Sequence, residues 1–137
     1  MAENQLRILV GMHRIVNEMD RETSHIAKEY DLTIGQFGVL EALFNKGDLS
    51  VGEVQEKILS TSGTIPVIVR NLMKRDLITQ KSDERDKRRV ILSLTDTGRK
   101  VIEQVYPKNV EGIKGIVDRL TPKEQEQLVS LLRKFQK

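Results

Sequence analysis

The chain contains no cysteine and few aromatic residues: two tyrosines, three phenylalanines and no tryptophan. Without cysteine there is no disulfide framework, no thiol chemistry and no Cys-based zinc site. Binders of RNA or single-stranded DNA need aromatic stacking platforms, so this class is disfavoured. No stretch approaches the roughly 18 apolar residues of a membrane span, and the N-terminus lacks a basic segment followed by an apolar run. These absences predict a cytoplasmic protein without membrane contact.

Catalytic constellations are also missing from the sequence. The two histidines, His13 and His25, lie twelve residues apart on one expected helix. Neither a Gly-rich phosphate loop nor a metal-ligand spacing occurs. We therefore expect no enzymatic activity, no metal and no cofactor. With 137 residues, the chain is long enough for one domain with its own core.

Basic charge is concentrated in one segment. Residues 62–89 hold eight Lys or Arg against four Asp or Glu, a net of +4, whereas the whole chain is +3. Such concentration is typical of a surface that binds a polyanion. Its centre is the run 83–89, DERDKRR, which lies between two alternating segments, 77–82 and 90–94, that read as the strands of a hairpin. A solvated charged loop has the same composition, so the neighbouring elements must decide.

Helix start signals recur along the chain. A hydroxyl residue precedes Gln or Glu by three positions at three places: Thr33 with Gln36, Ser50 with Glu53, and Thr121 with Glu124. These pairs predict helices over 34–45, 51–59 and 122–135. A tight connection, 60–63, then leads to a further helix with Pro66 near its first turn. A 4-3 apolar rhythm predicts a long first helix over 8–26 with two apolar faces.

The helix after residue 63 has two distinct sides at 100° per residue. One side carries Ile65, Ile68, Val69, Leu72 and Met73. The other carries small residues at its N-terminal end and basic ones at its C-terminal end: Gly63, Val67, Arg70, Asn71 and Lys74. Such a face suits the major groove of DNA, about 12 Å wide, although an ordinary amphipathic helix would give the same wheel.

Three motifs in order resemble the MarR family of winged helix-turn-helix regulators: NLMKRDLI at 71–78, DERDKR at 83–88 and LTDTG at 94–98. Within the family, the resemblance is nearest to quinone- and phenol-responsive members. It implies a mainly α fold with a small β-hairpin, in which 1–137 form a single domain. It further implies a winged helix-turn-helix DNA-binding region at 33–95, flanked by dimerisation segments 1–30 and 96–137.

The resemblance implies a homodimer that binds double-stranded DNA at a pseudo-palindromic operator, with half-sites about 34–36 Å apart. Repression is the commoner mode in this family. The ends of the chain supply apolar residues for a dimer, unless these pack within one chain: Val101, Val105, Ile113, Ile116, Val117, Leu120, Leu128, Leu131, Leu132 and Phe135. The alternative function is a winged-helix protein-interaction module.

The candidate DNA contacts lie in the turn, on the helix after it and in the hairpin tip: Ser60, Ser62, Gly63, Thr64, Val67, Arg70, Asn71, Lys74, Arg85, Lys87, Arg88 and Arg89. Asp83 and Asp86 can accept hydrogen bonds from the hairpin backbone or from guanidinium groups, and so hold the tip together. By resemblance, one arginine of the motif enters the minor groove while the other binds the acids. We favour Arg88 for the groove, followed by Arg85.

Family members often bind small phenolic or anionic effectors in a cleft between the dimerisation helices and the winged region. The candidates by location are residues with polar tips or aromatic rings: His13, Arg14, His25, Tyr30, Phe37 and Tyr106. Because the chain has no cysteine, it cannot sense oxidants through a thiol. Pro107 lies within a long expected helix, which we expect it to bend or interrupt.

Overall fold

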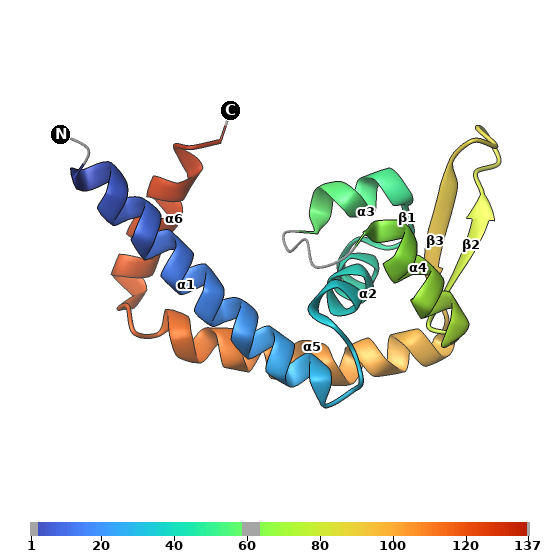
Figure 1. Cartoon of the computed structure of the whole chain (residues 1–137), viewed down its shortest axis with the longest axis horizontal. Helices are drawn as coiled ribbons and strands as arrows, with labels where there is room; N and C mark the ends of the chain where they lie inside the picture. Colours follow the sequence, from blue (N-terminus) through green and yellow to red (C-terminus); the bar gives the residue numbers. More distant parts are fainter. Residues whose placement is uncertain (1–2, 59–63, 137) are drawn as a thin grey trace.

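A computed structural model describes residues 3–58 and 64–136. In these residues the chain forms six helices and three short strands: α1 (Glu3–Lys28), α2 (Ile34–Lys46), β1 (Leu49–Ser50), α3 (Val51–Lys57), α4 (Ile65–Lys74), β2 (Ile78–Ser82), β3 (Val90–Leu94), α5 (Asp96–Val117) and α6 (Pro122–Arg133). Figure 1 shows two parts: a body of α2, α3, α4 and the strands, and an arm in which α1 and α5 lead away to α6. The predicted class, mainly α with a small hairpin, is confirmed.

The predicted helix starts are confirmed as reciprocal capping boxes. At α2, the Thr33 hydroxyl accepts from the Gln36 amide N–H (3.1 Å), and the Gln36 side chain accepts from the Thr33 N–H (3.0 Å). Ser50 with Glu53 at α3 and Thr121 with Glu124 at α6 repeat the arrangement. These pairs satisfy amide groups that a helix N-terminus otherwise leaves without partners. The connection 60–63 lies outside the described residues.

The strands form one antiparallel sheet in the order β1-β3-β2. The predicted hairpin is confirmed, with Ile78 opposite Leu94 and Ser82 opposite Val90. The third strand was not predicted, because β1 has only two residues and acquires its extended shape by pairing with β3. This pairing places the start of α3 beside the end of the hairpin from which the tip extends.

The core lies where α2, α4, the sheet and the first half of α5 meet. Its fully buried side chains include Leu40, Leu43, Leu72, Ile78, Leu92, Ile102 and Val105. Val105, which the sequence placed among residues available to a dimer, is therefore a core residue of its own chain, because the first half of α5 packs against α2. Ile116 is buried near the end of α5, so its assignment to a dimer surface is also corrected, whereas Val101 packs against the core and stays partly exposed.

The start of α5 is fixed against the start of β2. The Thr95 N–H donates to the Leu77 carbonyl (3.1 Å), and the Thr95 hydroxyl donates to the Asp76 carbonyl (2.6 Å). The same hydroxyl accepts from the Gly98 N–H (2.9 Å). A Cβ at Gly98 would lie 2.9 Å from the Leu77 carbonyl carbon and closer still to its oxygen. Glycine is thus needed for this close approach of helix to strand.

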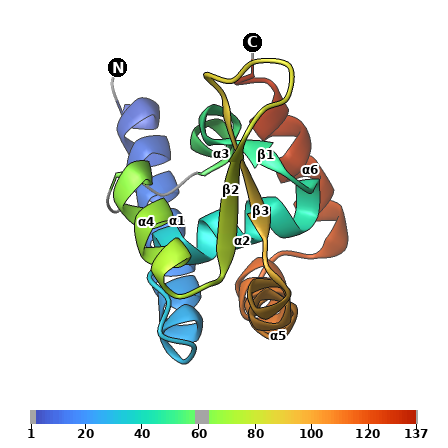
Figure 2. The same ribbon diagram turned by 90° about the vertical axis from the view of Figure 1, so that its right-hand side faces the viewer.

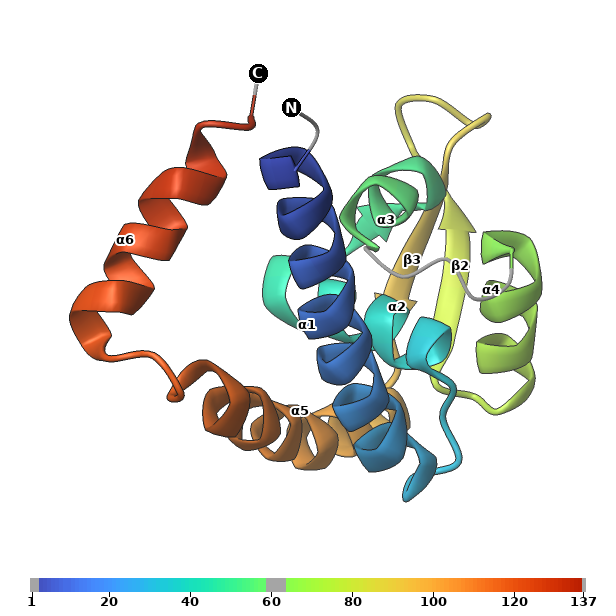
Figure 3. The ribbon, with the colours of Figure 1, turned by 60° about the vertical axis from the view of Figure 1, so that its left-hand side comes forward.

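The arm exposes much apolar surface. No residue of α6 is buried, and the exposed apolar side chains of α1, of α6 and of the segment just after α6 are Leu6, Ile8, Leu9, Val10, Met12, Val16, Leu128, Val129, Leu131, Leu132 and Phe135. Figure 3 shows α6 splayed away from α1 rather than packed along it. Bidentate contact of Arg119 with Glu18 joins the end of α5 to α1, one hydrogen bond measuring 3.0 Å.

Helix α5 continues through Pro107, so of the two expected effects, a bend or an interruption, the interruption does not occur. Among the described residues, no helix is both long and apolar enough to cross a membrane.

Candidate nucleic-acid interface

The outward side of α4 is polar and accessible. Thr64, Val67, Arg70, Asn71 and Lys74 are all exposed, whereas the opposite side of the helix is buried in the core. This two-sided arrangement is the one that the sequence predicts. The candidates Ser60, Ser62 and Gly63 lie outside the described residues.

Met73 departs from the predicted wheel, because it is 36% exposed rather than buried. It lies at the edge of α4, in a groove of about 600 Å³ between this helix and the hairpin, which Val51, Pro66, Gln80 and Val90 also line. The buried stripe of α4 is narrower than the wheel suggests, since four side chains fill the core contact: Ile65, Ile68, Val69 and Leu72.

Helix α4 and the hairpin share one face of the molecule. In Figure 2 both elements lie on the side turned to the viewer, with the hairpin tip projecting beyond the helices. The two elements that carry the exposed cations, α4 and the hairpin tip, therefore lie on the same side of the molecule. A helix flanked by a projecting basic hairpin can contact a major groove and the adjacent backbone or minor groove at once.

Two aspartates organise the hairpin tip, as the sequence predicts. The Asp83 carboxylate accepts from the backbone N–H of Arg85 (2.9 Å). Asp86 accepts from the backbone N–H of Arg88 (3.0 Å) and from its side-chain Nε (3.1 Å). These bonds hold the pKa of Asp86 below its usual range, because they favour the carboxylate. The acids thus fold a loop that carries four cations.

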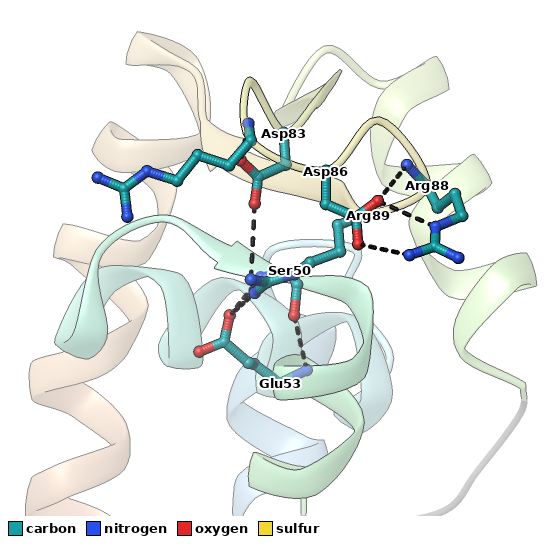
Figure 4. Close-up of polar contacts among 7 residues, drawn as sticks. Ser50, Glu53, Asp83, Asp86, Arg88 and Arg89 are labelled. Carbon is teal, nitrogen blue, oxygen red and sulfur yellow. Dashed lines mark hydrogen bonds and ion pairs between the residues drawn. The ribbon is translucent and has the colours of Figure 1, made fainter.

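Arg89 lies between two acids from different elements. Its guanidinium group contacts the Glu53 carboxylate on α3 at 3.1 Å and the Asp83 carboxylate of the tip at 3.5 Å. Figure 4 shows Arg89 between these carboxylates, while Arg88 extends to the other side with Asp86. The sequence grouped Arg89 with the DNA contacts, because a separation of 36 positions hides its pairing with Glu53.

The other cations of the tip are more available. The Arg88 side chain is 92% exposed although it is paired with Asp86. Neither Arg85 nor Lys87 forms an ion pair with any described residue, and both are exposed. The tip therefore offers Arg85, Lys87 and Arg88 to a partner, while Arg89 is engaged.

Arg75, at the C-terminal end of α4, binds the turn that joins α1 to α2. Its guanidinium donates to the carbonyls of Asp31 (2.6 Å) and Tyr30 (3.3 Å). Lys108 of α5 lies over the Tyr30 ring, 5.0 Å from its centre, and forms an ion pair with Glu29. The outward helix is thus joined to the arm by polar contacts as well as by the core.

A second candidate site is a cleft of about 300 Å³ where α1, α2, α3 and α5 meet. Its walls combine an apolar floor with polar side chains that the sequence did not single out: Asp20, Thr23, Glu41, Lys57 and Asn109. The Thr23 hydroxyl donates to the Asn109 side-chain carbonyl (2.7 Å). Burial raises the pKa of Glu41, because the carboxylate loses water.

The structure does not gather the six effector candidates into this cleft. Phe37 alone of the six lines it. Tyr106 packs against Phe44, with ring centres 5.5 Å apart, and Tyr30 lies against Lys108. His13, Arg14 and His25 are exposed on α1. The six candidates were chosen because they carry polar groups or aromatic rings on otherwise apolar helices. This criterion does not show which part of α1 meets the cleft, so the α1 residues that it selected do not line the cleft. No cluster suited to a metal occurs among the described residues.

Comparisons with known proteins agree with this geometry. The model of the family "Transcriptional regulator SarA/Rot" matches residues 21–105. The HTH-type transcriptional regulator MhqR of Bacillus subtilis is 27% identical over 98% of this chain and 92% of its own. The fold resembles that of a mutant Escherichia coli MarR complexed with operator DNA, with a TM-score of 0.85 and 20% identity over 100% of this chain and 99% of that one.

Two further solved structures are more similar in sequence. The Staphylococcus aureus MepR–DNA complex has a TM-score of 0.78 and 26% identity, over 90% of this chain and 92% of that one. Bordetella bronchiseptica BpsR, whose DNA binding is regulated by 6-hydroxynicotinic acid, has a TM-score of 0.78 and 27% identity, over 90% of this chain and 89% of that one.

Proposed function

The chain belongs to the SarA/Rot family of transcriptional regulators and has the MarR winged-helix fold, and from this premise we propose that it is a sequence-specific regulator of double-stranded DNA. The observation that carries the proposal is that α4 and the hairpin lie on one side of the molecule (Figure 2), and that these two elements carry the exposed cations Arg70, Lys74, Arg85 and Arg88. In this assignment α4 enters the major groove, and the hairpin tip is the wing.

We propose distinct roles for the outward residues. Arg70 and Asn71 lie on the exposed side of α4 and can read base edges, since Arg binds guanine and Asn binds adenine in the major groove. Lys74, Lys87 and the N-terminal residues of α4 neutralise or approach phosphates, which fixes the register of the protein on DNA. In the wing, Arg85 and Arg88 are the candidates for the minor groove, where a narrow A·T-rich segment attracts arginine.

We propose that the protein acts as a homodimer, with residues 33–95 as the DNA-binding region and residues 1–30 and 96–137 as the dimerisation region. The support is the exposed apolar side chains that recur along α1 and α6, whereas exposed apolar residues on a monomer are normally scattered singly. The first half of α5 contributes to both parts, because Ile102 and Val105 lie in the winged core. A two-fold dimer requires a pseudo-palindromic operator with half-sites about 34–36 Å apart.

We further propose repression that a small effector relieves, with the cleft between α1, α2, α3 and α5 as its binding site. The similarity to BpsR, whose DNA binding is regulated by 6-hydroxynicotinic acid, supports a small effector, and the polar side chains on an apolar floor support the cleft as its place. DNA affinity falls when a ligand binds more tightly to a dimer whose two α4 helices are not spaced to fit consecutive major grooves. Such a ligand lowers DNA affinity by the ratio of its affinities for the two dimer conformations, typically about 5- to 150-fold.

Selection of bound duplexes from a random library tests the DNA-binding function. We expect enrichment of a pseudo-palindrome. Binding should weaken steeply with salt, because the basic side chains of the protein release counterions condensed on the DNA and added salt opposes this release. Failure to enrich any sequence, with the protein folded, would favour the protein-interaction module instead. Release of the enriched duplex by phenolic, quinone or aromatic acid compounds then tests the effector.

A further inference from the structure

An acidic residue lies where the basic tip leaves the strands of the hairpin, and attraction to DNA alone gives no reason for an acid in this place. Glu53, in the first turn of α3, contacts Arg89 through its Oε1 at 3.1 Å. Its side chain is 47% exposed, so the carboxylate is accessible on the side of the molecule where the hairpin projects. A negative charge in this place repels a polyanion, and a half-exposed ion pair adds little to folding stability.

The Glu53 side chain has little freedom to move. The same Oε1 accepts from the Ser50 backbone N–H at 3.0 Å, and the Glu53 N–H returns a bond to the Ser50 hydroxyl at 3.1 Å. Ser50 belongs to β1, where it pairs with Ile91 of β3. The carboxylate is therefore anchored to the body of the fold, and the hydrogen bonds from Ser50 lower the pKa of Glu53 and keep it charged.

The hairpin tip needs such an anchor. The last strand pair joins Ser82 to Val90, and residues 83–89 extend beyond it as turns. The Asp83 and Asp86 carboxylates bind only other residues of the tip, namely Arg85, Arg88 and Arg89. Arg89 is the residue of the tip that also reaches α3. Its guanidinium, held by Asp83 on one side and Glu53 on the other, fixes the tip relative to the helices.

We propose that Glu53 is a positioning residue for DNA binding, which acts through Arg89 to hold the wing at the angle required when α4 lies in the major groove. Arg89 is then part of this clamp and not itself a DNA contact. The inference rests on the proposed DNA-binding function. Because Arg89 follows the DERDKR motif and Glu53 lies 36 residues away, the clamp is a property of the folded surface rather than of the motif.

Glu53→Gln separates positioning from simple charge. Glutamine preserves the capping box of α3, since Gln serves in the same place, but it removes the charge that holds Arg89. Glu56→Gln is the matched control, because Glu56 is exposed on the same helix and forms no ion pair with a described residue. Both variants remove one negative charge, so simple electrostatics predicts the same slight gain in affinity for any DNA.

The measurement compares affinity for the duplex selected by the wild-type protein with affinity for a scrambled duplex at two salt concentrations. We expect Glu53→Gln to bind the selected duplex about two- to fivefold more weakly per half-site, the range of an exposed ion pair, with no loss on the scrambled duplex. Glu56→Gln should lose nothing on either. Equal behaviour of the two variants would overturn the clamp, whereas a wild-type protein that selects no duplex would overturn the DNA-binding function itself.

Arg89→Gln and the double variant Glu53→Gln/Arg89→Gln test the same clamp from the other side. Partners in a clamp are non-additive, so the double variant should bind about as weakly as Arg89→Gln alone. Hydroxyl-radical footprints should lose protection at the wing while protection around α4 persists. Additive losses, with a salt slope reduced by about one in Arg89→Gln, would instead show that Arg89 contacts phosphate directly and would refute the clamp.

Discussion

Gly98→Ala is expected to destabilise the protein severely, although it adds a single methyl group to a helix. The new Cβ would lie 2.9 Å from the Leu77 carbonyl carbon, and the obstacle is main chain that no rotamer change can move. Helix α5 must shift away from β2, which weakens the bond from the Thr95 N–H to Leu77 and the cap between Thr95 and Gly98.

The magnitude follows from three losses and one gain. Overpacking costs about 1–3 kcal/mol, and the strained bond and cap each cost about 1 kcal/mol, while alanine returns about 0.5–1 kcal/mol through helix propensity. The net loss is about 3 kcal/mol, or roughly 10 °C in Tm for a chain of this size. Gly52→Ala is the control, because Gly52 also lies in the first turn of a helix after a hydroxyl cap, yet its Cβ would meet only the Ser50 hydroxyl at 4.0 Å.

Urea denaturation followed by circular dichroism measures both variants, at one protein concentration because dimerisation would shift the midpoint. Gly52→Ala should be neutral or slightly stabilising. A Gly98→Ala protein within about 0.5 kcal/mol of the wild type would show that the helix and strand can separate at this point without cost, and the argument from close approach would fail.

Four further outcomes are expected. Arg88→Ala should weaken binding to the selected duplex and reduce its salt slope by about 1, and unchanged affinity across salt concentrations would remove Arg88 from the contacts. Arg70→Ala should relax sequence preference, so an identical selected consensus for variant and wild type would contradict base reading by Arg70. Leu132→Asp should convert a dimer into a folded monomer in light scattering, since charge in a buried interface is poorly tolerated, and an intact dimer would exclude this face of α6. Because the folded pKa of Glu41 is raised above its usual 4.5, the folded state holds the proton more tightly, and this contribution to stability is lost as pH rises through the folded pKa. Glu41→Gln should therefore raise Tm at pH 7, with a gap that narrows as the pH falls through the folded pKa of Glu41 and is closed below about pH 4.5, and a constant gap would show that burial of the carboxylate is not its cause.

Local signals predicted much of the fold, because capping and turn chemistry act over a few residues. Thr33, Ser50 and Thr121 marked helix starts that the structure confirms, and the charged run at 83–89 marked a hairpin. The strand β1 was not predicted, because a two-residue segment becomes a strand only through its partner. Similarly, nothing local distinguishes the buried Val105 from apolar residues that stay exposed on α6.

The candidate site was less predictable than the fold, for the same physical reason. Residue type and helical position identified the outward face of α4 correctly. They could not show that Arg89 is bound by Glu53, or that Thr23 meets Asn109 across 86 positions of sequence. Contacts between distant segments depend on how whole elements pack, and the cleft is built almost wholly from such contacts.

Because the junction between α5 and β2 is fixed, a rotation of α5 is transmitted to the DNA-facing body. With 22 residues at about 1.5 Å each, α5 is roughly 33 Å long, and it carries the DNA-facing body at one end and the exposed apolar arm at the other. Because Thr95 and Gly98 hold the start of α5 rigidly against the winged body, the helix and this body move together. A rotation of α5 by about 10° about its C-terminal end therefore displaces the body by roughly 6 Å over this length. This exceeds the spacing of stacked bases, about 3.4 Å. A small change in the angle of the arm is thus enough to move α4, the helix proposed to contact base edges, by more than the spacing of one base pair.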